Sequence, residues 1–150
     1  MIQDQGWASW WPKTLVLASA SPRRAALLEQ IGVRFVVRPA DIPELLPFPM
    51  SPGEGAEWLA CRKAEAVADK YSDGVVLAAD TVVSIDGMIL GKPETIDDAR
   101  SMLGSLSDRT HTVYTGMAAI SIASGRCLSV AEGTDVTMHE LEPTLIDAYV

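Results

Sequence analysis

Residues 14–37 decide the fold, and they read TLVLASASPRRAALLEQIGVRFVV. The apolar run Thr14–Ala18 predicts a strand. The Ser-Pro pair at positions 21 and 22 supplies an N-cap and a first-turn proline for a helix that is predicted to stop at Gly32. Residues 33–37 predict a second strand. A strand, a tight turn, a helix and a strand in this order are typical of an α/β fold.

The rest of the chain continues the alternation of helices and strands. The predicted elements are a loop over 40–55, a helix from Ser51-Pro52 to about Tyr71, a strand over Val75–Ile85, a return strand Met88–Leu90 after an Asp86-Gly87 turn, a helix over Asp97–Leu103, strands over Thr110–Ile122 and Cys127–Met138, and a last helix over Glu142–Val150. We therefore expect an N-terminal arm, residues 1–13, and a single domain over 14–150. Its expected architecture is a mixed twisted central sheet flanked by helices.

Composition limits the classes of function. The chain has 150 residues, of which 48% are hydrophobic and 21% charged, as in a globular domain. A formal net charge of −8 argues against a nucleic-acid groove, but a small anion needs only a few local cations. The first residues lack the pattern of a signal peptide and no apolar run reaches about 18 residues, so we expect a cytoplasmic protein with neither a signal peptide nor a membrane span. Cys61 and Cys127 are expected to be ordinary thiols in a reducing cytosol.

Function tends to lie where local sequence rules are broken, and residues 19–24 break one. Arg23 and Arg24 fall in the first turn of the predicted helix, where the helix dipole favours acidic side chains. Free backbone N–H groups at the same end favour an anion, and arginine suits phosphate oxygens. The segment therefore predicts a phosphate site. The alternative is an N-cap followed by two solvated arginines.

Asp80 breaks the rule for a buried strand, because it lies in the middle of the run predicted over Val75–Ile85. A buried carboxylate costs several kcal/mol unless it is paired or binds a metal, and aspartate is disfavoured in strands. A bulge or turn that lets Asp80 reach water is the structural alternative. The functional prediction is a metal ligand, a general base or both.

Two lysines, Lys63 and Lys92, also occupy positions that are unusual for a lysine. Lys63 has Leu59 and Val67 four residues away on either side, so it lies on or beside the buried stripe of its helix. It either extends to water or points its ammonium into a pocket. Lys92 stands in a tight Gly-Lys-Pro loop, which suits a phosphate.

Together these residues suggest a triphosphate held by cations, with a carboxylate holding a divalent ion. The acidic loop from Asp41 to Glu44 could add a metal ligand. Hard oxygen ligands suit Mg²⁺ or Mn²⁺.

These motifs, in this order, resemble the Maf-like nucleotide pyrophosphatases, also described as septum formation inhibitors. The matching patterns are S-x-S-P-R-R at 19–24, D-x-x-E at 41–44, L-A-x-x-K-A at 59–64, A-D-T-V-V at 79–83, G-K-P at 91–93 and a long match over 99–116. The resemblance extends from about Leu15 to Val150. It implies a Maf/ITPase-like architecture with a substrate cleft.

The resemblance also implies a reaction: hydrolysis of a nucleoside triphosphate to the monophosphate and pyrophosphate. Asp80 would be the catalytic residue, and Glu44 and Asp80 would hold Mg²⁺ or Mn²⁺. Arg23 and Thr81 match the branch that acts on dTTP and UTP, with modified pyrimidine nucleotides as further candidates, rather than the branch that acts on 7-methylguanosine triphosphate. The residues expected to bind the phosphates are Ser19, Ser21, Arg23, Arg24, Lys63 and Lys92.

The resemblance carries three further expectations. Family members continue beyond the position of Val150, so the C-terminal part of the family domain is expected to be absent from this sequence. A homodimer is possible. The alternative function is a nucleotide-binding regulator of septum formation that does not turn its ligand over, and measuring turnover separates the two.

Overall fold

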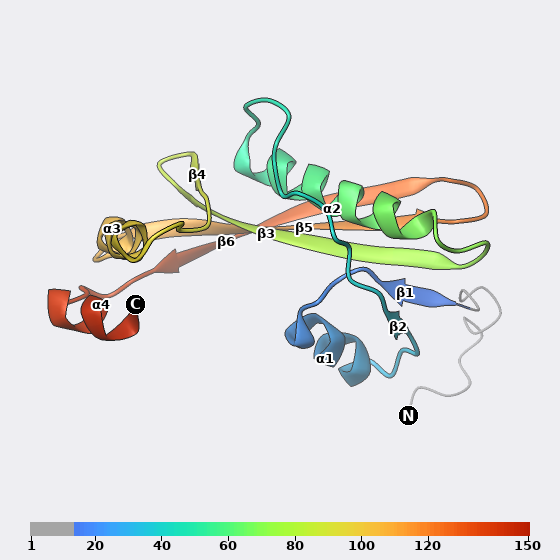
Figure 1. Ribbon diagram of the computed structural model, residues 1–150, viewed down its shortest axis with the longest axis horizontal. Coiled ribbons are helices and arrows are strands. Elements are labelled where there is room, and N and C mark those ends of the chain that lie inside the picture. The colour runs from blue at the N-terminus through green and yellow to red at the C-terminus, as the bar shows by residue number, and fades with distance from the viewer. Residues whose placement is uncertain (1–13) are drawn as a thin grey trace.

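The computed structural model describes residues 14–150, which form a six-stranded mixed sheet with helices around it (Figure 1). The strand order is β2-β1-β3-β5-β6, and β4 also pairs with β3. The predicted α/β fold is confirmed, whereas the arm predicted over 1–13 lies outside the described residues. The strands are β1 Leu15–Leu17, β2 Val36–Val37, β3 Val75–Ile85, β4 Met88–Leu90, β5 Thr110–Ser121 and β6 Cys127–Thr137, and the helices are α1 Pro22–Gln30, α2 Pro52–Ala68, α3 Ile96–Leu106 and α4 Pro143–Tyr149.

Local sequence signals account for most of these bounds. Helix α2 begins with a capping box, in which Ser51 and Glu54 satisfy each other's backbone N–H groups. It ends three residues before the predicted Tyr71, because the chain tightens into a turn after Asp69. Strand β2 is shorter than predicted and pairs with β1 at two positions only.

Helix α2 covers one face of the sheet, and the core lies between them (Figure 1). Side chains from α2 pack on alternate residues of β3 and β5, such as Val76 and Ala118. The helix approaches closely at Gly116 of β5, where an added Cβ would lie 2.2 Å from the carbonyl carbon of Ala56. Gly116 stands opposite Asp80 in the ladder, so the absence of a side chain brings α2 down onto the sheet beside Asp80.

One edge of β3 is left partly open, and this opening positions the site. Strand β5 pairs with one edge of β3 from Val75 to Ser84. On the other edge, β1 pairs only with Val75–Leu77 and β4 only with Val83–Ile85. Among the strands formed by residues 14–150, none pairs with residues 78–82 on that side. The loop after β1 and the start of α1 come to this opening, where Arg24 donates to the Ala79 carbonyl.

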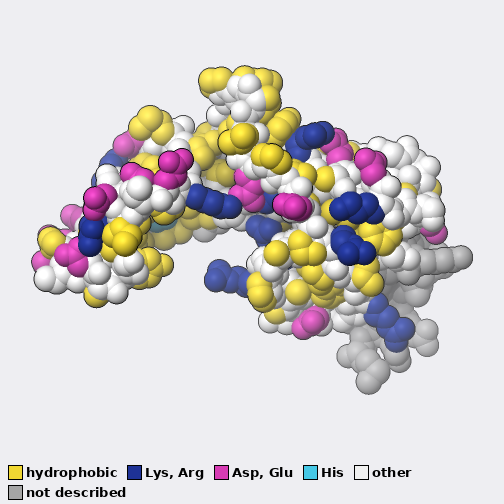
Figure 2. Space-filling model, viewed as in Figure 1, with side chains coloured by type: hydrophobic (Ala, Val, Ile, Leu, Met, Phe, Trp, Pro, Cys, Tyr) yellow, Lys and Arg dark blue, Asp and Glu magenta, His cyan; other side chains and the backbone are white. Residues whose placement is uncertain are grey.

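The remaining helices lie at the far end of the sheet, where α3 and α4 are joined by a hydrogen bond from Arg100 Nε to Asp147 Oδ1 of 2.8 Å (Figure 1). A hollow separates this end from the part that carries α1, and Lys and Arg side chains lie along its rim (Figure 2). None of the helices formed by residues 14–150 is long and apolar enough to cross a bilayer.

Candidate active site

The buried pair of Asp80 and Lys63 is the centre of the site. The Lys63 ammonium donates to Asp80 Oδ1 from α2, and only 12% of the Lys63 side chain and 8% of the Asp80 side chain are exposed. The β3 ladder runs without a bulge through Asp80. Asp80 therefore does not reach water through a bulge or turn. Lys63 likewise points its ammonium inward rather than extending to solvent.

Glu44 bridges the two lysines of the site from the loop before α2. Its Oε1 accepts from Lys63 Nζ at 2.6 Å, and its Oε2 accepts from Lys92 Nζ. The hydrogen bonds from Lys63 and then Lys92 are the main reasons that the pKa of Glu44 is lowered to about 2. The same bond to Glu44 raises the pKa of Lys92, whose side chain is 84% exposed. Both carboxylates of the site thus face the Lys63 ammonium.

Hydroxyl groups line the start of α1. The Oγ of Ser19 accepts from the Ser21 backbone N–H at 3.2 Å and from Arg24 Nη1 at 3.1 Å. Its own hydroxyl hydrogen is therefore left to donate. Ser21 is the N-cap residue of α1, but its side chain makes no capping hydrogen bond. Both serines can thus donate to an anion at this helix N-terminus.

The two arginines of α1 take different positions. The Arg24 guanidinium also donates to the Ala79 carbonyl at 2.8 Å and to Thr81 Oγ1 at 3.1 Å. It thus fixes α1 against the open edge of β3. Arg23 is exposed and lines a pocket on the face of the sheet that carries Thr81.

Two adjoining pockets bring most of the predicted residues together, whereas Asp80 and Lys92 line neither of them and join the site through Lys63 and Glu44. The smaller, of about 240 Å³, is lined by residues that include Ser19, Arg24, Glu44 and Lys63. The larger, of about 730 Å³, shares Ser21 and Arg24 with it and is more apolar. Its lining residues are Ser21, Pro22, Arg23, Arg24, Leu27, Thr81, Val113 and Thr115.

Three residues that line the larger pocket were not singled out from the sequence, namely Leu27, Val113 and Thr115. Thr115 stands opposite Thr81 in the ladder, with 3.4 Å between the two Oγ1 atoms. Strand alternation places Val113 and Thr115 on the same face of the sheet. The signal that could have found them is therefore the period of two along β5, read together with its pairing to β3.

The donor set is compatible with a divalent ion at Glu44 and Asp80. Both carboxylates contact the Lys63 ammonium, so their oxygens already lie close to one positive charge. Carboxylate oxygens are ligands that Mg²⁺ and Mn²⁺ accept, and Mg²⁺ commonly takes its other ligands from water and substrate phosphates. Within residues 14–150, no group of three or more His, Cys, Asp or Glu side chains is placed to hold a metal. Protein ligands alone would therefore fill only part of the coordination shell.

The fold belongs to a known class of architecture. The Ham1 protein of Staphylococcus aureus superposes with a TM-score of 0.56 at 18% sequence identity, over 87% of this chain and 73% of that one. The HAM1 protein of Coxiella burnetii superposes with a TM-score of 0.52 at 17% identity, over 81% of this chain and 71% of that one. At these identities the likeness concerns the fold alone.

The sequence defines the family within that class. The chain belongs to the Maf-like protein family, which it matches over residues 14–150. A relative from Moorella thermoacetica is 46% identical over 136 residues, 91% of this chain and 70% of the relative. One from Bacillus cereus is 44% identical over 138 residues, 92% of this chain and 67% of the relative. Both relatives are named dTTP/UTP pyrophosphatase.

Proposed function

We propose that this chain hydrolyses a nucleoside triphosphate to the nucleoside monophosphate and pyrophosphate, with dTTP and UTP as the preferred substrates. The observation that carries the proposal is the buried Lys63 ammonium held between Asp80 and Glu44, next to the start of α1. The names of the relatives support the reaction and the two substrates.

The charge at the site matches an anionic ligand that arrives with a cation. Four cationic side chains and two carboxylates leave a local net charge of +2, although the whole chain carries −8. The cationic residues are Arg23, Arg24, Lys63 and Lys92, and the carboxylates are Asp80 and Glu44. This local charge attracts a triphosphate without neutralising it fully, which leaves room for a divalent ion.

The smaller pocket suits the phosphates. Ser19 and Ser21 would donate hydrogen bonds from the start of α1, and Lys63 and the exposed Lys92 would stabilise phosphate charge. Arg24, which already donates to three protein oxygens, would act mainly by holding Ser19 and the edge of β3 in place. The more apolar pocket beside Arg23 and Thr81 would take the base and sugar.

Asp80 would accept the proton of the water that attacks the α-phosphorus, as pyrophosphate leaves. Strand pairing on β3 fixes the direction of its carboxylate, and Lys63 holds that carboxylate in place. Glu44 and Asp80 would hold the Mg²⁺ or Mn²⁺ ion. When bound, the ion supplies positive charge to the phosphates and lowers the pKa of bound water.

Pyrophosphate release tests the proposal. The purified chain is incubated with Mg²⁺ or Mn²⁺ and with dTTP, UTP, CTP, GTP or 7-methylguanosine triphosphate, beside an Asp80→Asn variant. We expect release from dTTP and UTP above the others, and a loss of at least 100-fold in the variant. Circular dichroism checks that the variant is folded.

Two results would contradict parts of the proposal. Nucleotide binding without pyrophosphate release would sink the hydrolytic function and support the regulator of septum formation instead. Release mainly from 7-methylguanosine triphosphate would overturn the assignment of Arg23 and Thr81 to the pyrimidine branch.

A further inference from the structure

The two cysteines of the chain meet at the contact between α2 and β6. The Sγ atoms of Cys61 and Cys127 are 3.8 Å apart, although 66 positions separate the residues in sequence. Both are free thiols. The chain has no other cysteine, so the pair is its complete set of thiols.

The meeting follows from a matched register between helix and strand. Three contacts follow one another along α2. At the first, an added Cβ at Gly53 would lie 3.8 Å from the Ala131 Cβ. At the second, Glu57 accepts a hydrogen bond from Ser129, and at the third, Cys61 contacts Cys127. Each step is four residues forward on α2 and two residues back on β6. Four helical residues rise about 6 Å and two strand residues about 6.7 Å, so the two spacings nearly coincide. The contact between the cysteines is therefore the third in a regular series of contacts between α2 and β6.

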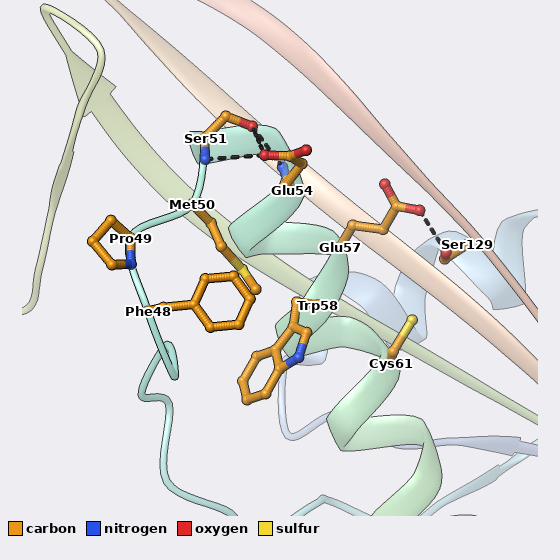
Figure 3. Close-up of a pocket in the computed structure, with 9 residues that line it drawn as sticks. All are labelled: Phe48, Pro49, Met50, Ser51, Glu54, Glu57, Trp58, Cys61 and Ser129. Carbon is orange, nitrogen blue, oxygen red and sulfur yellow. Dashed lines mark hydrogen bonds between the residues drawn. The ribbon is translucent and has the colours of Figure 1, made fainter.

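The pair is accessible from outside. Cys127 is exposed, and Cys61 is half-buried at the margin of a groove of about 540 Å³ that also contains Glu57, Trp58 and Ser129 (Figure 3). Glu57 and Cys61 both extend from α2 toward the strand that carries Ser129 (Figure 3). This groove shares no lining residue with the two pockets of the candidate active site.

We propose that Cys61 and Cys127 form a redox-active dithiol that a small-molecule disulfide converts into an intramolecular disulfide bond joining α2 to β6. One cysteine thiolate attacks the small disulfide, forms a mixed disulfide and releases one small thiol. The other cysteine then attacks the mixed disulfide, the bond between the cysteines forms and a second small thiol leaves. The two cysteines lose two protons and two electrons, and the small disulfide gains them. The Sγ atoms need to approach by about 1.8 Å to reach the length of a disulfide bond.

The surroundings keep the pair reduced under mild conditions. Although Cys127 is exposed as a residue, partial desolvation of its thiol is the first reason that its pKa is raised to about 11, followed by the contact with Cys61 and the nearby carboxylates of Glu65 and Glu57. A thiol that retains its proton is a poor nucleophile, so oxidation is expected to be slow near neutral pH. The test is therefore run at about pH 8.5.

The experiment uses the whole chain and oxidised glutathione. We expect the wild-type chain to lose two hydrogens by intact mass spectrometry, to lose both titratable thiols, and to remain a monomer on a non-reducing gel. The thermal midpoint should rise by several degrees, because the bond closes a long loop, and should return on reduction with dithiothreitol. Cys61→Ser and Cys127→Ser serve as matched controls, and each should instead gain one glutathione.

Other products would overturn the inference. A wild-type chain that carries two glutathiones, or that forms covalent dimers, would show that the two sulfurs do not reach each other. These readouts do not depend on the proposed hydrolysis.

Discussion

At the scale of single residues, the Lys63–Asp80 pair affects both the stability of the folded chain and the proposed hydrolysis. Both side chains are largely excluded from water, so each charge depends on the other for compensation. Glu44 has a second cationic partner in Lys92, but no other cation is hydrogen-bonded to Asp80 within residues 14–150. Loss of Lys63 therefore leaves Asp80 as an uncompensated buried charge.

A double-mutant cycle measures this dependence. We expect Lys63→Met to lower the free energy of unfolding by about 3–5 kcal/mol, because it breaks a buried pair from one side. Lys63→Met combined with Asp80→Asn should recover much of the loss, since no buried charge then remains. Urea unfolding at neutral pH gives all four values. Strictly additive single effects would show that the two side chains are not coupled.

Glu44 predicts a specific pH dependence. Its pKa is about 2 in the folded chain and 4.5 ordinarily, so folding favours its ionised form. The stability that this provides is fully present above about pH 4.5 and is lost as the pH falls towards 2. Wild type should therefore exceed Glu44→Gln in urea midpoint at pH 6, and the difference should shrink towards pH 3. A difference that stays constant over that range would contradict the assignment.

The sequence singled out residues that the structure places close together, but it did not predict which side chains they contact. Asp80 stood out because it is a carboxylate within an apolar strand, and Lys63 stood out because it lies on the apolar face of a helix. Their contact could not be predicted, since it depends on how α2 is placed over the sheet. Arg24 shows the same limit: it was predicted to bind phosphate, but its hydrogen-bond partners Ala79 and Thr81 are 55 and 57 residues away. Cys61 and Cys127 gave no signal at all, since only the register of α2 on β6 brings them together.

At the scale of elements, the close packing of α2 on the sheet depends on one position in β5, Gly116. The backbone of α2 lies so close at Gly116 that any Cβ meets the Ala56 carbonyl. Because Asp80 stands opposite Gly116, this contact also sets the height of Lys63 above the strand. The packing of one helix thereby determines the geometry of the site.

Substitution by alanine tests this seating. We expect Gly116→Ala to lower the free energy of unfolding by about 3 kcal/mol, because α2 has to move away from the sheet. Gly104→Ala is the matched control: an added Cβ at this helical position meets nothing within 4 Å, so it should stabilise the chain by up to about 1 kcal/mol. Urea unfolding gives both values. A neutral Gly116→Ala would show that the helix accommodates the methyl group.

Element boundaries were predictable where the local signal is strong. The almost continuous apolar run predicted the observed bounds of β3, Val75–Ile85, and the Asp-Gly turn predicted the return into β4. Helix α3 is longer than predicted, because a capping box at Thr95 and Asp98 starts it one residue earlier and it extends to Leu106. Strand β2 is shorter than its apolar run, because only two positions of β1 pair with it.

At the scale of the whole molecule, the site is assembled from segments that are distant in sequence. Its residues come from the start of α1, the loop before α2, α2 itself, β3 and the loop after β4. The opening along β3 between β1 and β4 is where these segments converge. The family resemblance predicted this set of residues, but local patterns alone gave neither the sheet order nor the opening.

The ladder between β3 and β5 also has a consequence for how quickly activity can return after denaturation. It pairs ten positions, from Val75 opposite Ser121 to Ser84 opposite Thr112. Because side chains alternate, a slip of one residue would turn Asp80 away from α2 and put a neighbour in its place. A chain trapped in that arrangement would keep its strands and much of its compactness, but the Asp80 carboxylate would no longer lie beside Lys63. Refolding therefore has to correct the alignment before it restores the candidate site, and recovered secondary structure is no measure of a recovered site.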